Sequence, residues 1–277
     1  MKSGRVYDET YDRLILAPGA SPLRPPIPGI DPPGGRPCAT STTRTGSRRG
    51  STALKHAVVV GAGFIGLEMA ENLVRRGVET TVVELQDQVL PPLDSEMTAL
   101  IARTTCREWR GFASRSSAEA FEPGPEGLVV RLKSGERLPA GLVVLGVGVR
   151  PESGLASAAG LEIGPRGGFV NPHMQTSDSE IYAVGDVVEV TGFVTGEPTQ
   201  IPLAGPANRQ GRIAADPHLR PRQPLPRHAG DGHRPRFDQT PPRPANPRSH
   251  SDAPGRSYEK IYIHPNQHAG YFPAHGR

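Results

Sequence analysis

Residues 56–84 read HAVVVGAGFIGLEMAENLVRRGVETTVVE, and this stretch decides the fold. Its first part, residues 57–60, is a run of mostly β-branched residues typical of a buried parallel strand. From 64 to 76 the apolar side chains recur with helical spacing, and Gly77 is of the residue type that commonly ends a helix. Residues 80–83 are again β-branched. The stretch therefore predicts a β-α-β unit in an α/β fold with a parallel sheet.

Three glycines, Gly61, Gly63 and Gly66, join the first strand of this unit to its helix. The spacing G-x-G-x-x-G between a strand and a helix, with the acidic Glu84 ending the next strand, is the dinucleotide-binding fingerprint. Gly61 permits the tight turn, Gly63 lets a pyrophosphate approach the backbone because it has no Cβ, and Gly66 lets the helix pack closely on the strand. The alternative is an ordinary glycine turn.

The start of the helix and the end of the second strand predict how the dinucleotide is held. The backbone at Phe64 and Ile65 offers N–H groups and a partial positive charge to the phosphates. Glu84 can accept hydrogen bonds from the hydroxyl groups of the adenosine ribose. A carboxylate there repels a 2′-phosphate, and residues 85–88 contain no arginine to compensate. The sequence predicts NAD(P)H as cofactor, with NADH favoured.

The composition predicts folded blocks separated by segments that do not fold. The chain has 277 residues, of which 33 are Gly and 31 Pro, and only 35% are hydrophobic. An evenly packed α/β chain would be richer in apolar residues. The net charge of +4 comes from basic segments at 32–55 and 217–257. Neither has an aromatic platform or a helical period, so irregular structure is a better interpretation than a nucleic-acid-binding face.

Cellular location is predicted from what the sequence does not contain. No run of about 18 apolar residues predicts a membrane span, and the N-terminus lacks the pattern of a secretory signal. The two cysteines, Cys38 and Cys106, fit neither a disulfide framework nor a CxxC pair. A cytoplasmic protein without a metal site or a membrane partner is expected.

Shorter elements are expected on either side of the β-α-β unit. The apolar periodicity is lost from 103 to 117. The expected elements are strands at 12–17, 181–184 and 258–263, the start of a helix at 96–102 and a helix at 203–216. A β-meander is expected over 128–132 and 137–138, returning to a core strand at 142–145.

Four blocks of the chain together resemble the FAD-dependent pyridine nucleotide-disulfide oxidoreductases. Residues 56–84 resemble the NADH domain of that family, and YDRLILAPGASPLRPPIPG (11–29) resembles the strand that returns from its FAD domain. TSDSEIYAVGDVVEV (176–190) with PLAGPANRQGRIAAD (202–216) resembles the second FAD segment. SYEKIYIHPNQHAGYFP (257–273) resembles the dimerisation domain of the coenzyme A-disulfide reductase and NADH oxidase branch.

The resemblance implies a domain order. The NADH domain is expected to be a Rossmann-like, doubly wound parallel sheet with a β-meander, beside an incomplete FAD domain and disordered segments. The expected divisions are a remnant of the FAD domain (1–31), an irregular linker (32–54), the NAD(H)-binding domain (55–150), the second FAD segment (151–216), a disordered Pro/Arg-rich segment (217–257) and a remnant of the dimerisation domain (258–277).

The resemblance also implies an activity and its residues. Members pass a hydride from NAD(P)H to FAD and then electrons to an acceptor. A disulfide-type acceptor is expected, as in coenzyme A-disulfide reductase, and polysulfide, oxygen and quinone are the alternatives. Asp186 would hydrogen-bond the ribityl and phosphate region of the flavin, and the backbone of Leu203 and Ala204 would lie near its ring. The alternatives are that Asp186 forms an Asx turn closing a strand and that Leu203 and Ala204 are the start of a surface helix. Gly148 completes the expected cofactor-binding residues.

Two further side chains are implied to lie near the reaction centre. Glu68 would lie near the contact of nicotinamide and flavin, and Tyr271 would reach the active site of a partner subunit in a homodimer. Without the family, Glu68 is a solvated helix residue and Tyr271 a partly buried aromatic.

The chain also departs from the family pattern. A glycine-rich β-α-β unit for the FAD pyrophosphate and the redox cysteine that it carries have no counterpart in this sequence, and Cys38 and Cys106 do not match that cysteine. No catalytic residue is therefore assigned, and a catalytically inactive dinucleotide-binding remnant is the alternative to an enzyme. Residues 32–54, 103–117 and 217–257 match nothing in the family, which suggests either out-of-frame translation or genuine insertions.

Overall fold

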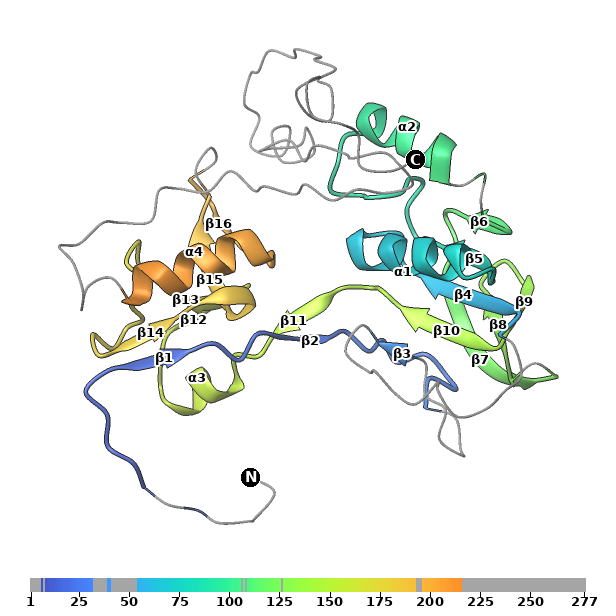
Figure 1. Ribbon diagram of the computed structural model, residues 1–277. Coiled ribbons are helices and arrows are strands. Elements are labelled where there is room, and N and C mark those ends of the chain that lie inside the picture. Colours follow the sequence, from blue (N-terminus) through green and yellow to red (C-terminus); the bar gives the residue numbers. More distant parts are fainter. Residues whose placement is uncertain are drawn as a thin grey trace. The chain divides into compact units, whose positions relative to one another are not determined.

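The computed structural model describes residues 6, 8–31, 39–40, 54–105, 107, 109–125, 127–192 and 196–215 (Figure 1). These residues form two compact units. One unit comprises the described residues from 24 to 147. The other comprises those up to residue 23 and those from residue 148 onward. The predicted disordered segment at 217–257 and the predicted strand at 258–263 lie outside the described residues, as do Cys38, Cys106 and Tyr271.

The unit of residues 24–147 is built on a five-stranded sheet in the order β3-β10-β4-β5-β6. Every neighbouring pair in this sheet is parallel. The strands are β3 (Ala39–Thr40), β4 (His56–Val60), β5 (Glu79–Val83), β6 (Gly111–Ala113) and β10 (Leu142–Leu145). The predicted α/β fold with a parallel sheet is therefore confirmed.

The two faces of β4 contribute to two different cores. Ala57 and Val59 belong to a core that includes Leu67 and Ala70 of α1 (Phe64–Arg75). Val58 and Val60 point the other way, into a core shared with an antiparallel meander. The meander consists of β7 (Ala118–Gly124), β8 (Gly127–Leu132) and β9 (Arg137–Ala140). Because β4 packs against a core on each of its two faces, its sequence is continuously apolar.

The segment 103–117 is more regular than its sequence predicts. Helix α2 (Ser95–Thr105) extends past the predicted start, and β6 pairs in parallel with β5 at the sheet edge. Trp109 is buried with 6% of its surface exposed, and its ring centroid lies 5.7 Å from that of Phe112. Strand β6 is not evident in the sequence because a three-residue strand carries too little periodicity to be recognised, while two aromatic residues supply the burial.

The other unit contains small sheets and helix α4 (Ala204–Ala215). Strand β1 (Leu14–Leu16) pairs in parallel with β14 (Ile181–Ala183), and these two strands lie within the predicted strands at 12–17 and 181–184. Strand β2 (Ala20–Pro22) pairs antiparallel with β11 (Val149–Pro151). Its core includes Met174, Tyr182 and Ala214. The remaining elements are α3 (Gly154–Ala158), β12 (Ile163–Gly164), β13 (Gly167–Phe169), the short 3-10 helix η1 (Gly185–Val187), β15 (Val188–Thr191) and β16 (Pro198–Thr199).

The meander carries a network of ion pairs centred on Glu122. Arg137 Nη2 lies 2.6 Å from Glu122 Oε2, and Arg131 Nε lies 3.0 Å from Glu122 Oε1. Hydrogen bonding by Arg137, with a smaller contribution from Arg131, holds the pKa of the Glu122 carboxyl below its ordinary value of 4.5.

This network predicts a specific acid sensitivity. Because the pKa of Glu122 is lower in the folded state, the pairing stabilises the fold above pH 4.5, and this stabilisation is lost as the pH falls through the folded-state pKa. We expect Glu122→Gln to lower the free energy of unfolding near neutral pH and to flatten its decline below pH 4.5. Urea unfolding at several pH values measures this. Parallel curves for the variant and the wild type would contradict it.

Candidate functional site

The glycine loop lies at the carboxyl end of β4, between this strand and α1. Gly61 has φ 102°, and a Cβ on it would lie 2.4 Å from the carbonyl oxygen of Gly146. A Cβ on Gly66 would lie 1.8 Å from the carbonyl oxygen of Gly61, and a Cβ on Gly146 would lie 3.2 Å from the Cα of Gly66. The backbone of the loop, the helix and the segment after β10 therefore touch, which only glycine allows.

Gly63 differs from its two neighbours in the loop. Its φ of −74° and ψ of −173° are open to any residue, and a Cβ on it would meet no protein atom within 4 Å. Neither conformation nor packing therefore requires glycine here. Because Gly63 has no Cβ, there is open space beside the start of α1. No side chain caps this helix, and its first turn contains no acidic residue. This space fits a dinucleotide pyrophosphate.

Glu84 is fixed against this loop although it comes from the end of β5. The N–H of Ala62 donates to its Oε2 at 2.6 Å, and the N–H of Gln86 donates to its Oε1 at 2.9 Å. The residue is buried, with 7% of its surface exposed. Each carboxylate oxygen has a second lone pair, so Glu84 can still accept hydrogen bonds from ribose hydroxyl groups.

The remaining candidates on α1 follow directly after the glycine loop. Phe64 is half-buried and packs against the core beneath the helix, whereas Ile65 is 36% exposed. Glu68 is half-buried one turn further along the helix. The structure therefore brings the six candidates Gly61, Gly63, Phe64, Ile65, Gly66 and Glu84 together at one end of the sheet.

The other candidates belong to the second unit. Asp186 lies in η1, after Gly185 with its φ of 83°. The N–H of Gly185 donates to Gln210 Oε1 at 2.7 Å, which ties η1 to α4. Leu203 and Ala204 stand at the start of this helix, whose first turn has no acid.

The carboxylate of Asp186 is available to a ligand. It is half-buried, and none of the described residues donates a hydrogen bond to it. A free acceptor in η1, which is tied to a helix without acid in its first turn, is compatible with a group that carries both hydroxyls and phosphates, as FAD does.

Gly148 has a structural reason to be glycine. Its φ is 113°, its carbonyl oxygen accepts a hydrogen bond from the N–H of Leu23 at 3.0 Å, and a Cβ would lie 3.2 Å from Leu23 Cδ1. The described residues thus explain Gly148 without a ligand, and its cofactor contact stays a prediction.

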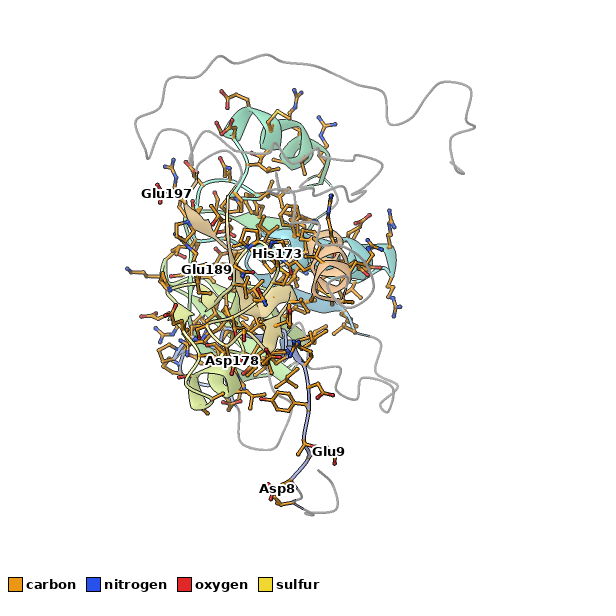
Figure 2. All side chains as sticks on the ribbon, turned by 90° about the vertical axis from the view of Figure 1, so that its left-hand side faces the viewer. Asp8, Glu9, His173, Asp178, Glu189 and Glu197 are labelled. Carbon is orange, nitrogen blue, oxygen red and sulfur yellow. The ribbon has the colours of Figure 1, made fainter. Side chains whose placement is uncertain are left out.

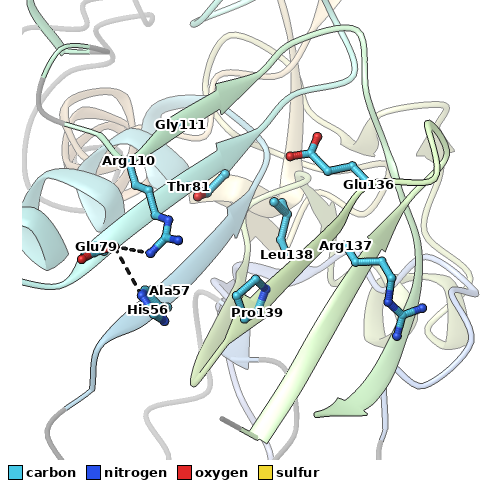
Figure 3. A pocket seen from close by; sticks show the side chains of 10 residues that line it. All are labelled: His56, Ala57, Glu79, Thr81, Arg110, Gly111, Glu136, Arg137, Leu138 and Pro139. Carbon is cyan, nitrogen blue, oxygen red and sulfur yellow. Dashed lines mark hydrogen bonds and ion pairs between the residues drawn. The ribbon is translucent and has the colours of Figure 1, made fainter. Parts of the chain in front are cut away.

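A separate pocket of about 270 Å³ lies at the amino ends of β4, β5 and β6, opposite the glycine loop (Figure 3). Glu79 holds its wall together, because its Oε2 lies 3.3 Å from His56 Nε2 and also pairs with Arg110. These charges are satisfied within the wall, and nothing there points to a cofactor.

The described part of the chain holds no metal-binding cluster of three His, Cys, Asp or Glu residues. The acidic and histidine side chains labelled in Figure 2 include the buried Glu189, whose Oε2 accepts the N–H of Arg166 at 2.8 Å.

No helix among the described residues has the length and apolar character needed to cross a membrane.

Comparison with known proteins identifies the family. Residues 2–211 match the model of the pyridine nucleotide-disulphide oxidoreductases. The chain belongs to this family. Its members are NAD(P)H-dependent flavoprotein oxidoreductases that use FAD, so the resemblance noted in the sequence is confirmed.

Individual relatives within this family cover most of the chain. The NADH oxidase of Methanocaldococcus jannaschii is 39% identical over 77% of this chain and 48% of its own length. The CoA-dependent NAD(P)H sulfur oxidoreductase of Pyrococcus furiosus is 32% identical over 77% of this chain and 49% of its own. The crystal structure of reduced Bacillus anthracis CoADR-RHD matches with a TM-score of 0.85 and 38% identity, over 98% of this chain and 49% of that one. The chain thus spans about half the length of these relatives.

Proposed function

We propose that this chain binds NADH at the glycine loop and FAD at the unit that carries Asp186, and that it takes part in hydride transfer from NADH to the flavin. The acceptor of the electrons would be a disulfide, as for a coenzyme A-disulfide reductase. The observation that carries the proposal is the open space at Gly63 beside the uncapped start of α1. The names of the relatives support a nicotinamide-dependent redox function.

The contribution of the chain to binding NADH is electrostatic and steric. The first-turn amides of α1 and the partial positive charge of its N-terminus would stabilise the pyrophosphate. Glu84, held by two backbone amides, would orient the ribose and disfavour a 2′-phosphate through its negative charge. These two features together favour NADH over NADPH.

The residues proposed to hold FAD also combine a hydrogen-bonding carboxylate with the positive end of a helix. Asp186 would accept hydrogen bonds from its hydroxyl groups, and the start of α4 at Leu203 and Ala204 would direct its positive end towards the ring. When bound, FAD supplies the two-electron chemistry. A homodimer and a cytoplasmic location stay predictions from the sequence.

A dinucleotide-binding module without turnover is the second candidate. It is favoured by one observation, that the whole glycine-loop site lies within the unit of residues 24–147, which has its own sheet and cores. Binding of NADH therefore does not require that the other unit hold FAD.

An absorbance spectrum and calorimetry with NADH together distinguish the two candidates. We expect the purified chain to be yellow, and its flavin absorbance to bleach when NADH is added without oxygen. A colourless protein that releases heat on binding NADH would support the module instead. A protein with neither flavin absorbance nor NADH binding would contradict both.

A further inference from the structure

The turn after β6 lies against the loop that carries Glu84. The N–H of Arg115 donates to the carbonyl oxygen of Gln86 at 2.9 Å, and the N–H of Ser116 donates to that of Glu84 at 2.9 Å. Arg115 has φ 52°, in the left-handed region that few non-glycine residues adopt. These backbone bonds fix an arginine beside the end of the site where the adenosine ribose would lie.

The guanidinium of Arg115 is paired with an acid of the same loop. Its Nη2 lies 3.2 Å from Asp87 Oδ2, and the two side chains are 77% and 59% exposed. An exposed pair of this kind is weak, so Asp87 competes with a stronger anion for the guanidinium but does not exclude it. A phosphate is such an anion, because arginine binds it with two parallel hydrogen bonds.

Two negative charges and one positive charge therefore meet at this loop. The Glu84 carboxylate is buried, Asp87 is exposed, and Arg115 is neutralised by Asp87. Arg115 does not stand out in the sequence, because it is 28 positions from Asp87 and the loop itself contains no arginine.

We propose that Asp87 and Arg115 form a cofactor-selecting pair. Asp87 competes with the 2′-phosphate of NADPH for this guanidinium, and so adds to the preference for NADH that Glu84 creates. The inference rests on the proposed NADH site and assigns the residues that set its selectivity.

The test is the ratio of the affinities for NADPH and NADH, measured by calorimetry on the full chain. Loss of the competing carboxylate in Asp87→Asn should raise this ratio about tenfold, the effect of one strengthened charge-assisted contact. The double variant Asp87→Asn with Arg115→Ala should return the ratio to the wild-type value. The gain should also shrink as salt is added, because both partners are exposed.

A matched control separates this effect from general charge. Glu119→Gln removes another exposed carboxylate of the same unit, one that pairs with Arg131 2.7 Å away, and should leave the ratio unchanged. An unchanged ratio in Asp87→Asn, or a gain that survives in the double variant, would overturn the proposed pair while NADH still binds. If the wild type binds no NADH, the proposed site itself fails, and the pair fails with it.

Discussion

Gly66→Ala is expected to lower the free energy of unfolding of the 24–147 unit by about 3 kcal/mol or more, whereas Gly63→Ala should leave it nearly unchanged and weaken NADH binding. The Cβ added at Gly66 would lie 1.8 Å from the carbonyl oxygen of Gly61. That oxygen belongs to the backbone, so it cannot move aside without shifting the glycine loop that joins β4 to α1.

The Cβ added at Gly63 meets no protein atom within 4 Å, and the backbone there suits alanine. The methyl group would instead occupy the space proposed for the pyrophosphate, and we expect the affinity for NADH to fall at least about tenfold, which corresponds to about 1.4 kcal/mol. Urea unfolding and calorimetry on each variant measure the two effects separately.

The control for both glycines is Gly154→Ala, in α3 of the other unit. Its added Cβ also meets nothing within 4 Å, and no ligand is proposed there, so both stability and NADH affinity should be close to wild type. If Gly63→Ala binds NADH as tightly as this control does, the open space at Gly63 does not hold the pyrophosphate.

These two glycines also show how far the sequence predicts the site. The fingerprint and Glu84 lie in one continuous stretch, where strand and helix periodicities are strong enough to be read directly. Gly146 and Arg115 complete the surroundings only through tertiary structure, because β10 pairs with β4 and the turn after β6 meets the loop after β5. Contacts of that kind leave no local pattern.

The same distinction applies to the fold. The β-α-β unit and most of the meander are predicted, but β6 and β7 are not, since one is three residues long and the other contains Pro123. In the second unit, the significance of Asp186 and Leu203 came from resemblance alone. A glycine followed by an aspartate, or a leucine before a helix, is too common to indicate a flavin site.

Glu84→Ala is expected to reduce both stability and binding. It removes the acceptor of the Ala62 and Gln86 N–H groups, at 2.6 and 2.9 Å, in a site that is 7% exposed. Charge-assisted hydrogen bonds of this kind contribute about 1.5–3 kcal/mol each, so the loss of both is expected to lower the free energy of unfolding by roughly 3–6 kcal/mol. The affinity for NADH should fall roughly 100-fold, because the ribose loses its acceptor and the glycine loop its anchor.

Glu84→Gln separates the two roles of this carboxylate. The amide keeps one oxygen for the backbone but turns an N–H₂ group towards the second backbone donor, so stability should lie between those of Glu84→Ala and the wild type. Removing the charge also removes the repulsion of a 2′-phosphate, so the NADPH to NADH affinity ratio should rise. If Glu84→Gln keeps both the wild-type affinity for NADH and the wild-type ratio, Glu84 only anchors the glycine loop. In that case the selection of NADH must come from elsewhere, and the ratio in Asp87→Asn indicates whether it comes from the neighbouring arginine.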